Sequence, residues 1–255
     1  MAYKQPSIIK QQSYFVVKSN KIIQKSRFSM SVQQQKVMLY LISKIRPQDD
    51  ETRYYQITIR DFCKVCNIDY DNGQNYINVK KAIKEIADKS MWLTLPSGKE
   101  VLLRWLNRVE IDKAGGVINV SFHEDMMPFL LDLQEKYTQY SLELVLPMKS
   151  KYGIRLYELL KSYSFMDKNI TFTIDELKTR MDCDKYKRFP DFRRYALEKA
   201  VEDINTFSDL SVSYSLRKSE GCRSYTKITF RIDEAEGIDN IVRRMRRNKE
   251  LAGSR

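Results

Sequence analysis

The feature that most constrains the fold is an internal repeat of three colinear blocks. The first half of the chain contains, in order, VMLYLISKI (37–45), YYQITIRDFCKVCNID (54–69) and VKKAIKEIADKSMWLTL (79–95). The second half contains, in the same order, IRLYELLKSY (154–163), NITFTIDELKTRMDCD (169–184) and RRYALEKAVEDINTFSDLSVSYS (193–215). Three blocks in one order at a nearly constant offset predict two copies of a single folding unit.

Each copy predicts the same order of elements. Ser31 can cap a first helix whose apolar residues recur every four positions. A short alternating strand follows, and then a short helix opened by Asp61 in the first copy and by Asp175 in the second. A longer amphipathic helix and a β-hairpin complete each unit. Helix, strand, helix, helix and hairpin form the order of a winged helix-turn-helix, in which the third helix enters the major groove and the hairpin is the wing.

The predicted fold class is therefore α+β, with two tandem winged helix-turn-helix domains related by the repeat. In the first copy, we expect the wing to combine MWLTL with EVLLRWLNRVEI and GVINVSF; in the second, LSVSYSL pairs with SYTKITFRI. The connecting segment 123–150 is not a Gly/Ser linker. The expected organisation is an N-terminal arm (1–28), a first domain (29–140), a second domain (141–235) and a basic C-terminal tail (236–255).

The charge of the chain favours a polyanionic partner. Its 255 residues include 45 Lys and Arg against 33 Asp and Glu, which gives a formal net charge of +12. Such an excess is typical of proteins that bind nucleic acid or an anionic membrane surface. No apolar run reaches the ~20 residues of a membrane span, and the N-terminus lacks the pattern of a signal peptide. We therefore expect a cytoplasmic protein with no membrane partner.

The residues that could support catalysis lack the partners that the chemistry needs. Tyr195 and Lys199 have the Y-x-x-x-K spacing of some dehydrogenases, but no glycine-rich dinucleotide turn accompanies them. His123 is the single histidine, which argues against a two-histidine metal site of rolling-circle initiators. The acidic run 49–51 is expected to be a solvated loop. A nicking enzyme with a tyrosine nucleophile remains a distant alternative, and we expect no enzyme activity, catalytic residue or cofactor.

The spacing of the cysteines likewise predicts no metal site. Cys63 and Cys66 form one C-x-x-C pair, whereas Cys183 and Cys222 stand alone. A structural zinc site needs four ligands at suitable spacing. We expect reduced thiols and no metal site.

Three segments carry a resemblance to a known family. They are SMSVQQQKVMLYLISKI at the first helix, KSKYGIRLYELLKSY at the start of the second domain and FRRYALEKAVEDIN at its third helix. Together with the twin winged-helix order over residues 15–233, they resemble the initiator replication proteins of theta-replicating plasmids, which bind directly repeated origin sequences called iterons.

The resemblance implies a protein that binds double-stranded plasmid origin DNA at direct repeats, opens the origin and recruits host replication proteins. Those partners would be the host initiator, the replicative helicase or the primase. It also implies a homodimer that represses its own promoter and a monomer that is active on iterons. The second domain would make the main base-specific contacts, and the first would add DNA contacts and form the dimer interface. A dedicated winged-helix transcriptional repressor is the alternative.

The helical pattern separates the core face of each third helix from its outer face. In the second domain, Leu197, Ala200, Val201 and Ile204 should face the core. The expected DNA contacts of this domain are Arg193, Arg194 and Lys199 on the helix, Lys187 and Arg188 before it, and Arg217, Lys218, Arg223 and Lys227 around the wing. Those of the first domain are Asn75, Asn78, Lys80, Lys81 and Lys84. Arginine can bond guanine, and asparagine adenine, in bidentate fashion; a solvated charged face is the alternative.

Overall fold

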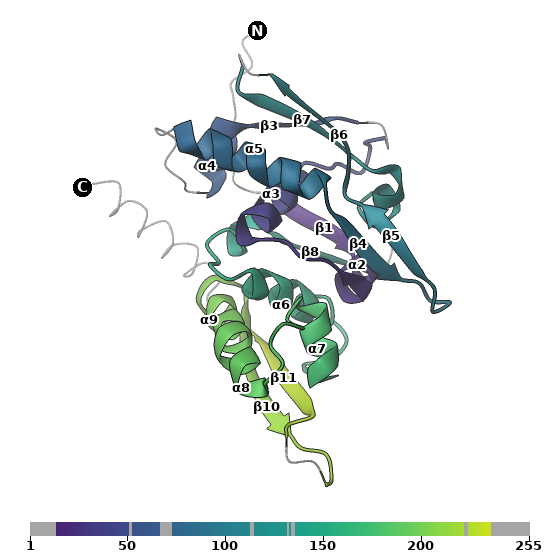
Figure 1. Cartoon of the computed structure of the whole chain (residues 1–255), viewed down its shortest axis with the longest axis vertical. Helices are drawn as coiled ribbons and strands as arrows, with labels where there is room; N and C mark the ends of the chain where they lie inside the picture. Colours follow the sequence, from purple (N-terminus) through teal and green to yellow (C-terminus); the bar gives the residue numbers. More distant parts are fainter. Residues whose placement is uncertain are drawn as a thin grey trace, which may run out of the picture. The chain divides into compact units, whose positions relative to one another are not determined.

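The computed structural model describes residues 14–50, 53–66, 73–112, 115–131, 133, 136–221 and 224–235, with backbone alone for 64–66 and 73–75. The chain divides into two compact units, Met1–Pro147 and Met148–Arg255 (Figure 1). The boundary lies a few residues after the expected position of 140/141.

The first unit contains the predicted helix-turn-helix. Its elements are α3 (Val32–Ile42), β3 (Tyr55–Thr58), α4 (Ile59–Cys66) and α5 (Gly73–Ala87). Ser31 caps α3 as expected: its Oγ accepts a hydrogen bond from the Gln34 backbone N–H at 3.2 Å, and Gln34 Oε1 accepts one from the Ser31 N–H at 2.9 Å. This reciprocal pair satisfies two donors that the first turn of a helix leaves unpaired.

The strands after α5 form two hairpins in two different sheets, where the sequence predicted one wing. They are β4 (Ser90–Thr94), β5 (Glu100–Arg104), β6 (Leu106–Asp112) and β7 (Val117–Phe122). One sheet has the order β2-β4-β5, where β2 is Ser26–Arg27, and the other has the order β3-β7-β6. The chain passes from one sheet to the other at Trp105, whose ring is buried.

Much of the predicted N-terminal arm belongs to the folded first unit. Strand β1 (Phe15–Ser19) pairs antiparallel with β8 (Tyr137–Ser141), and α2 (Asn20–Lys25) follows it. Two short 3-10 helices, Glu124–Phe129 and Leu142–Leu144, flank β8. The boundary expected at residue 28 therefore differs from the structure, because a pairing between distant strands leaves no local signal in the sequence.

The second unit has the simple winged-helix order. Its helices are α6 (Lys151–Lys161), α7 (Ile174–Arg180), α8 (Phe189–Phe192) and α9 (Glu198–Phe207), with a π-helical turn at Arg193–Leu197 between the last two. Its strands are β9 (Asn169–Thr173), β10 (Leu210–Arg217) and β11 (Lys227–Glu234), in the order β10-β11-β9. The hairpin β10–β11 is the wing (Figure 1).

The repeat is visible in the pairing of strands and in the caps. Strand β11 pairs antiparallel with β9 as β7 pairs with β3. Thr58 and Thr173 occupy equivalent positions in the repeat, and each caps the short helix that follows it. Each side-chain oxygen accepts a hydrogen bond from the backbone N–H three residues later, at 3.0 and 3.1 Å. The sequence assigned these helix starts to Asp61 and Asp175; the structure corrects the caps to the threonines. The matched Tyr40 and Tyr157 are both buried.

The start of α6 is held by a carboxylate from α9. Asp203 Oδ2 accepts hydrogen bonds from the backbone N–H groups of Lys149 (3.0 Å) and Ser150 (2.7 Å). Gly153 allows this approach, because a Cβ atom at this position would lie 2.7 Å from the same oxygen. A negative charge at a helix N-terminus is stabilising.

The other end of α6 is fixed to the residue before β10. Asp209 accepts hydrogen bonds from the Tyr157 hydroxyl at 2.8 Å and from Lys161 Nζ at 2.6 Å. Tyr157 is fully buried, and the charged pair is 16% and 14% exposed in its side chains. Burial, with the Asp209 carboxylate beside it, raises the pKa of Tyr157 well above its usual range.

The acidic run between α3 and β3 matches the predicted solvated loop only in part, and Glu51 lies outside the described residues. Asp49 is buried and accepts hydrogen bonds from the Arg46 backbone N–H (2.8 Å), Arg53 Nη1 (2.6 Å) and the Tyr55 hydroxyl (3.1 Å). Asp50 is exposed. The carboxylate of Asp49 therefore organises this loop, a role that local polarity could not indicate.

Candidate nucleic-acid interface

The third helix of the second unit is a composite of α8, one π-helical turn and α9. The turn closes with a hydrogen bond from the Glu198 N–H to the Arg193 carbonyl oxygen, five residues back. Phe192, Leu197 and Ile204 are fully buried and anchor the helix on the core. Val201, expected in the core, is half-buried. Turns of this kind occur often at functional sites, since they add a residue and re-aim the side chains that follow.

The outer face of this helix presents the cations that the sequence predicted. Arg193, Arg194 and Lys199 are all exposed. The two arginines differ in their surroundings. Arg193 Nε donates to Glu198 Oε1 at 2.8 Å, and hydrogen bonding to Glu198, followed by the charge of Tyr214, raises the pKa of the Arg193 guanidinium. Arg194 has no ion pair among the described residues and lies 5.4 Å from the centre of the Tyr195 ring. Arg194 is therefore the arginine available to an incoming ligand.

A stack of tyrosines supports this face, and the sequence reasoning missed it. The rings of Tyr195 and Tyr186 stack with centroids 6.0 Å apart, and Tyr186 meets the buried Tyr152 edge-to-face at 6.2 Å. Tyr195 is 44% exposed, next to Arg194. Tyr195 entered the sequence reasoning only as a candidate catalytic residue. The signal that could have pointed to the stack was Tyr186 among the charged residues of the loop before the helix.

The wing and the start of the helix lie together. The rings of Phe189, at the start of α8, and Tyr225, in the wing, have centroids 5.3 Å apart. Lys218 Nζ lies 5.5 Å from the centre of the Tyr225 ring. This contact places the start of the helix beside the wing. The exposed predicted cations of these elements are Lys187, Arg188, Arg193, Arg194 and Lys199 from the helix and its approach, and Arg217, Lys218 and Lys227 from the wing; we call this set the basic face. Arg223, also predicted here, lies outside the described residues.

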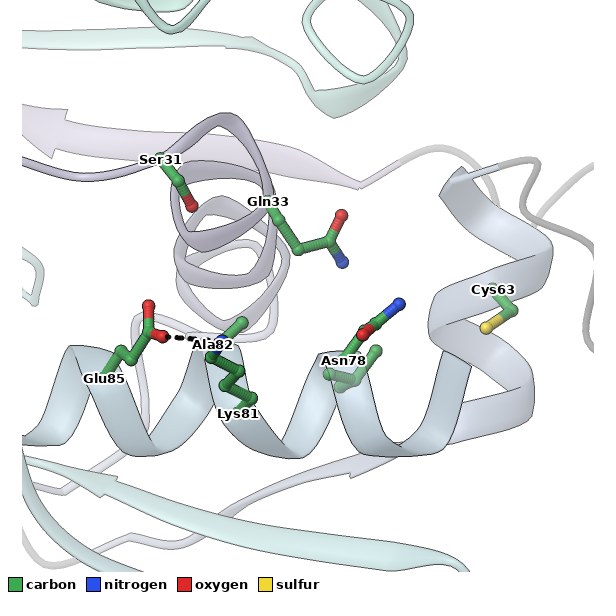
Figure 2. Close-up of a pocket in the computed structure, with 8 residues that line it drawn as sticks. Ser31, Gln33, Cys63, Asn78, Lys81, Ala82 and Glu85 are labelled. Atoms are coloured by element: carbon green, nitrogen blue, oxygen red, sulfur yellow. Dashed lines mark ion pairs between the residues drawn. The ribbon is translucent and has the colours of Figure 1, made fainter. Parts of the chain in front are cut away.

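The predicted contacts of the first unit are spread over more than one side of α5. Asn78 and Lys81 line a hollow of about 340 Å³ that also includes Ser31, the cap of α3, and Gln33 within that helix. Figure 2 shows these side chains, with the Lys81 ammonium paired to Glu85 at 3.9 Å.

Lys80 and Lys84, together with Lys81, line a second groove between α5 and β6. Lys84 Nζ lies 2.6 Å from Asp88 Oδ2, and this hydrogen bond raises the pKa of Lys84. Asn75 falls in the first turn of α5, and its side chain lies outside the description. The structure thus gathers the predicted residues of the second unit and disperses those of the first.

Of the residues considered for a metal, the structure describes Cys63, Cys183 and His123, whereas the side chains of Cys66 and Cys222 lie outside the description. Burial raises the pKa of the Cys63 thiol and raises that of Cys183 to about 12, whereas thiolates are the metal ligands. His123 Nδ1 accepts the Asp125 backbone N–H at 3.3 Å. Within the described ranges, no three His, Cys, Asp or Glu side chains are grouped to hold a metal ion. Among the same residues, no helix combines the length and hydropathy of a membrane span.

Comparison with protein-family models gives two matches in tandem. Residues 15–161 match "Initiator Replication protein, WH1", and residues 173–232 match "Initiator Rep protein, WH2". The chain belongs to the initiator replication protein family. Both winged-helix units of this initiator are thereby assigned, and the resemblance inferred from the sequence is confirmed.

The chain is also similar to individual proteins and solved structures. The initiator is 28% identical over 158 residues to the PI protein of Escherichia coli, covering 55% of this chain and 52% of that protein. The chain thus matches about half the length of this curated relative. A crystal structure of the Pi initiator protein in complex with iteron DNA is similar with a TM-score of 0.72 and 21% identity, covering 88% of this chain and 99% of that one. The likeness confirms the twin winged-helix fold. Domains 2 and 3 of RctB align less closely, with a TM-score of 0.49 and 13% identity over 82% of this chain and 85% of that one.

Proposed function

We propose that this initiator binds double-stranded plasmid origin DNA at direct repeats and nucleates origin opening, with the second unit as the main reader of sequence. The observation that carries the proposal is the basic face, where the third helix and the wing meet through Phe189 and Tyr225. The similar structure of the Pi initiator protein with iteron DNA supports the same class of ligand. A helix beside a wing is the arrangement that places side chains in the major groove and cations on the phosphates.

Within the basic face we assign different roles to the cations. Arg194 has no acidic partner among the described residues, so its guanidinium can bond guanine O6 and N7, a contact that discriminates by about 1–3 kcal/mol. Arg193 is held by Glu198 and serves as a phosphate contact or a support for the helix. The remaining cations bind phosphates: Lys187, Arg188, Lys199, Arg217, Lys218, Lys227 and, outside the described residues, Arg223.

The first unit contributes in our proposal through residues of α5, drawn from the exposed Asn78, Lys80, Lys81 and Lys84 and from Asn75, whose side chain lies outside the description. We further propose that the protein acts in the cytoplasm, forms a homodimer that represses its own promoter, binds iterons as a monomer, and recruits the host initiator, helicase or primase without catalysis of its own. A dedicated repressor is the second candidate; the bound form of the Pi initiator protein, an iteron complex, favours the initiator.

The decisive measurement is footprinting of the purified chain on its own plasmid origin. We expect protection of several direct repeats. Protection of a single promoter palindrome alone would favour the repressor. Incubation with supercoiled origin plasmid and magnesium should leave the DNA uncut; a covalent protein–DNA product would show instead that the chain is a nicking enzyme.

Anisotropy titrations then test the assigned residues. Arg194→Ala should weaken binding to the repeat by about 10-fold or more and leave binding to random duplex nearly unchanged. Arg231→Ala is the matched control, because Arg231 is an exposed arginine of the same unit that pairs with Asp233 at 3.0 Å. If roughly eight phosphates are neutralised, the logarithm of the association constant should fall with that of the salt concentration at a slope of about −7. Equal loss of specific and random binding in Arg194→Ala would refute its reading role.

A further inference from the structure

A groove between α5 and β6 has no part in the proposed contacts of the second unit with DNA. Three residues that line it, Lys80, Lys81 and Lys84, belong to the set from which we draw the DNA contacts of the first unit, so a ligand in this groove would compete with DNA for them. It has a volume of about 620 Å³, and its walls are largely apolar. Ile83 and Ala87 of α5 lie on one side, and Val109 and Ile111, alternate residues of β6, lie on the other. Ile77 lies at its rim with 56% of its surface exposed. An apolar hollow of this kind on a protein surface marks a binding site more often than an accident of packing.

The groove lies beside a free sheet edge. In the order β3-β7-β6, the strand β6 pairs only with β7 among the described residues. Val109 and Ile111 are half-buried, although Ile83 behind them is buried. The apolar surface therefore continues from the core to the solvent at this edge, and it leaves room for further side chains to pack.

The rim of the groove carries positive charge. Its described lining includes Lys80, Lys81 and Lys84 and no acidic residue. Lys81 and Lys84 pair with Glu85 and Asp88 on the exposed side of α5, and exposed pairs of this kind are weak because water screens them, so they exchange readily for another carboxylate. Lys80 has no ion pair among the described residues.

A ligand must satisfy both the apolar floor and the lysine rim. A DNA backbone supplies phosphates but nothing to fill an apolar hollow. A second copy placed across a twofold axis would bring the same lysines against one another, which is repulsive. We propose that the α5–β6 groove binds an acidic amphipathic segment of a partner protein, whose apolar side chains fill the groove and whose carboxylates meet the three lysines. This is the way in which amphipathic helices bind hydrophobic grooves.

The test uses two fluorescent 16-residue peptides with the same leucines at helical spacing and either glutamate or lysine at the other positions. Fluorescence anisotropy is measured with the full chain. The glutamate peptide should bind in the micromolar range, and the lysine peptide at least 10-fold more weakly. Equal binding of the two peptides, or no binding of the glutamate peptide, would overturn the proposal.

Matched variants locate the peptide. Ile77→Ser should weaken the glutamate peptide at least fivefold, whereas Leu102→Ser, at a side chain of the same unit that is also 56% exposed, should change it less than twofold. Lys80→Glu should weaken it at least threefold, and Lys99→Glu, on an exposed turn of the same unit, should not. Both tests use variants whose tryptophan fluorescence matches the parent, since Trp105 is buried in this unit.

Two outcomes would assign the groove to another ligand and refute the proposal. If Ile77→Ser weakens binding to the DNA repeat as much as Arg194→Ala does, the groove belongs to the DNA interface. If the glutamate peptide does not bind and Ile77→Ser converts a dimer to a monomer in sedimentation experiments, the groove is an interface between copies. Arg194→Ala distinguishes the groove proposal from the proposal on DNA binding. This variant should lose binding to the DNA repeat and keep its affinity for the glutamate peptide.

Discussion

Replacement of Asp209 by alanine should destabilise the second unit by about 3 kcal/mol. The magnitude follows from the two donors that lose their acceptor. The Tyr157 hydroxyl is buried, and a buried donor left without a partner costs about 1–3 kcal/mol. Lys161 loses a charged hydrogen bond of 2.6 Å, but its side chain is 16% exposed and the ammonium can turn toward water, so we take about 1 kcal/mol for it. For a unit of roughly a hundred residues, this sum lowers Tm by about 12 °C or more.

The assay should follow the second unit alone. Hydrogen exchange measured by mass spectrometry on peptides from α6 and α9 reports its unfolding, while fluorescence of the two tryptophans, Trp92 and Trp105, reports the first unit. Asp209→Ala should accelerate exchange in α6 and leave the tryptophan transition in place. Asp233→Ala is the control, because Asp233 pairs with Arg231 at the surface and its loss should cost less than about 0.5 kcal/mol. A change in Asp209→Ala no larger than in this control would refute the reasoning.

Three further predictions concern the same scaffold. Gly153→Ala should destabilise the second unit by about 1–3 kcal/mol, measured by the same exchange experiment, because the new Cβ would displace the Asp203 carboxylate from the start of α6; unchanged exchange would contradict this. Asp49→Ala should destabilise the first unit by about 2 kcal/mol in urea unfolding followed by tryptophan fluorescence, since a buried phenol and an arginine lose their acceptor. Raising the pH above 10.0, the ordinary pKa of tyrosine, should lower the stability of the second unit. The reason is that the unfolded state loses the Tyr157 proton near this pH, whereas the folded state, in which the pKa of Tyr157 is raised, keeps it. Tyr157→Phe should therefore flatten the dependence of stability on pH between pH 8 and pH 11.

The elements that depend on local pattern could be predicted from the sequence. The repeat led to the twin winged-helix fold, and the expected capping of α3 by Ser31 is confirmed by the hydrogen bond from the Gln34 N–H. Val79, Ile83 and Ile86, at helical spacing, all lie in the core. These features depend on neighbours within a few residues, so periodicity and capping chemistry are sufficient to find them.

The features that were missed depend on partners far along the chain or on a competition between two residues. The sequence could not show that β1 would pair with β8, or that Asp49 would turn inward to Arg53 and Tyr55. The sequence placed Arg193 and Arg194 together on one outer face. It could not show that Arg193 would pair with Glu198, because this pairing depends on the π-helical turn at Arg193–Leu197. The helical pattern thus predicted which residues form the candidate interface. The folded structure was needed to separate Arg193, which pairs with Glu198, from Arg194, which has no ion pair among the described residues.

The pairing of β1 with β8 has a consequence for the order in which the protein folds during synthesis. Residues 15–19 leave the ribosome early, yet their partners at 137–141 emerge only after the rest of the first unit. Until then, β1 is an unpaired strand on a nascent chain, a state that is open to association with other chains. The second unit closes through contacts much nearer in sequence, and contacts of this kind form fast. The unit synthesised last can therefore complete its fold soon after the unit synthesised first.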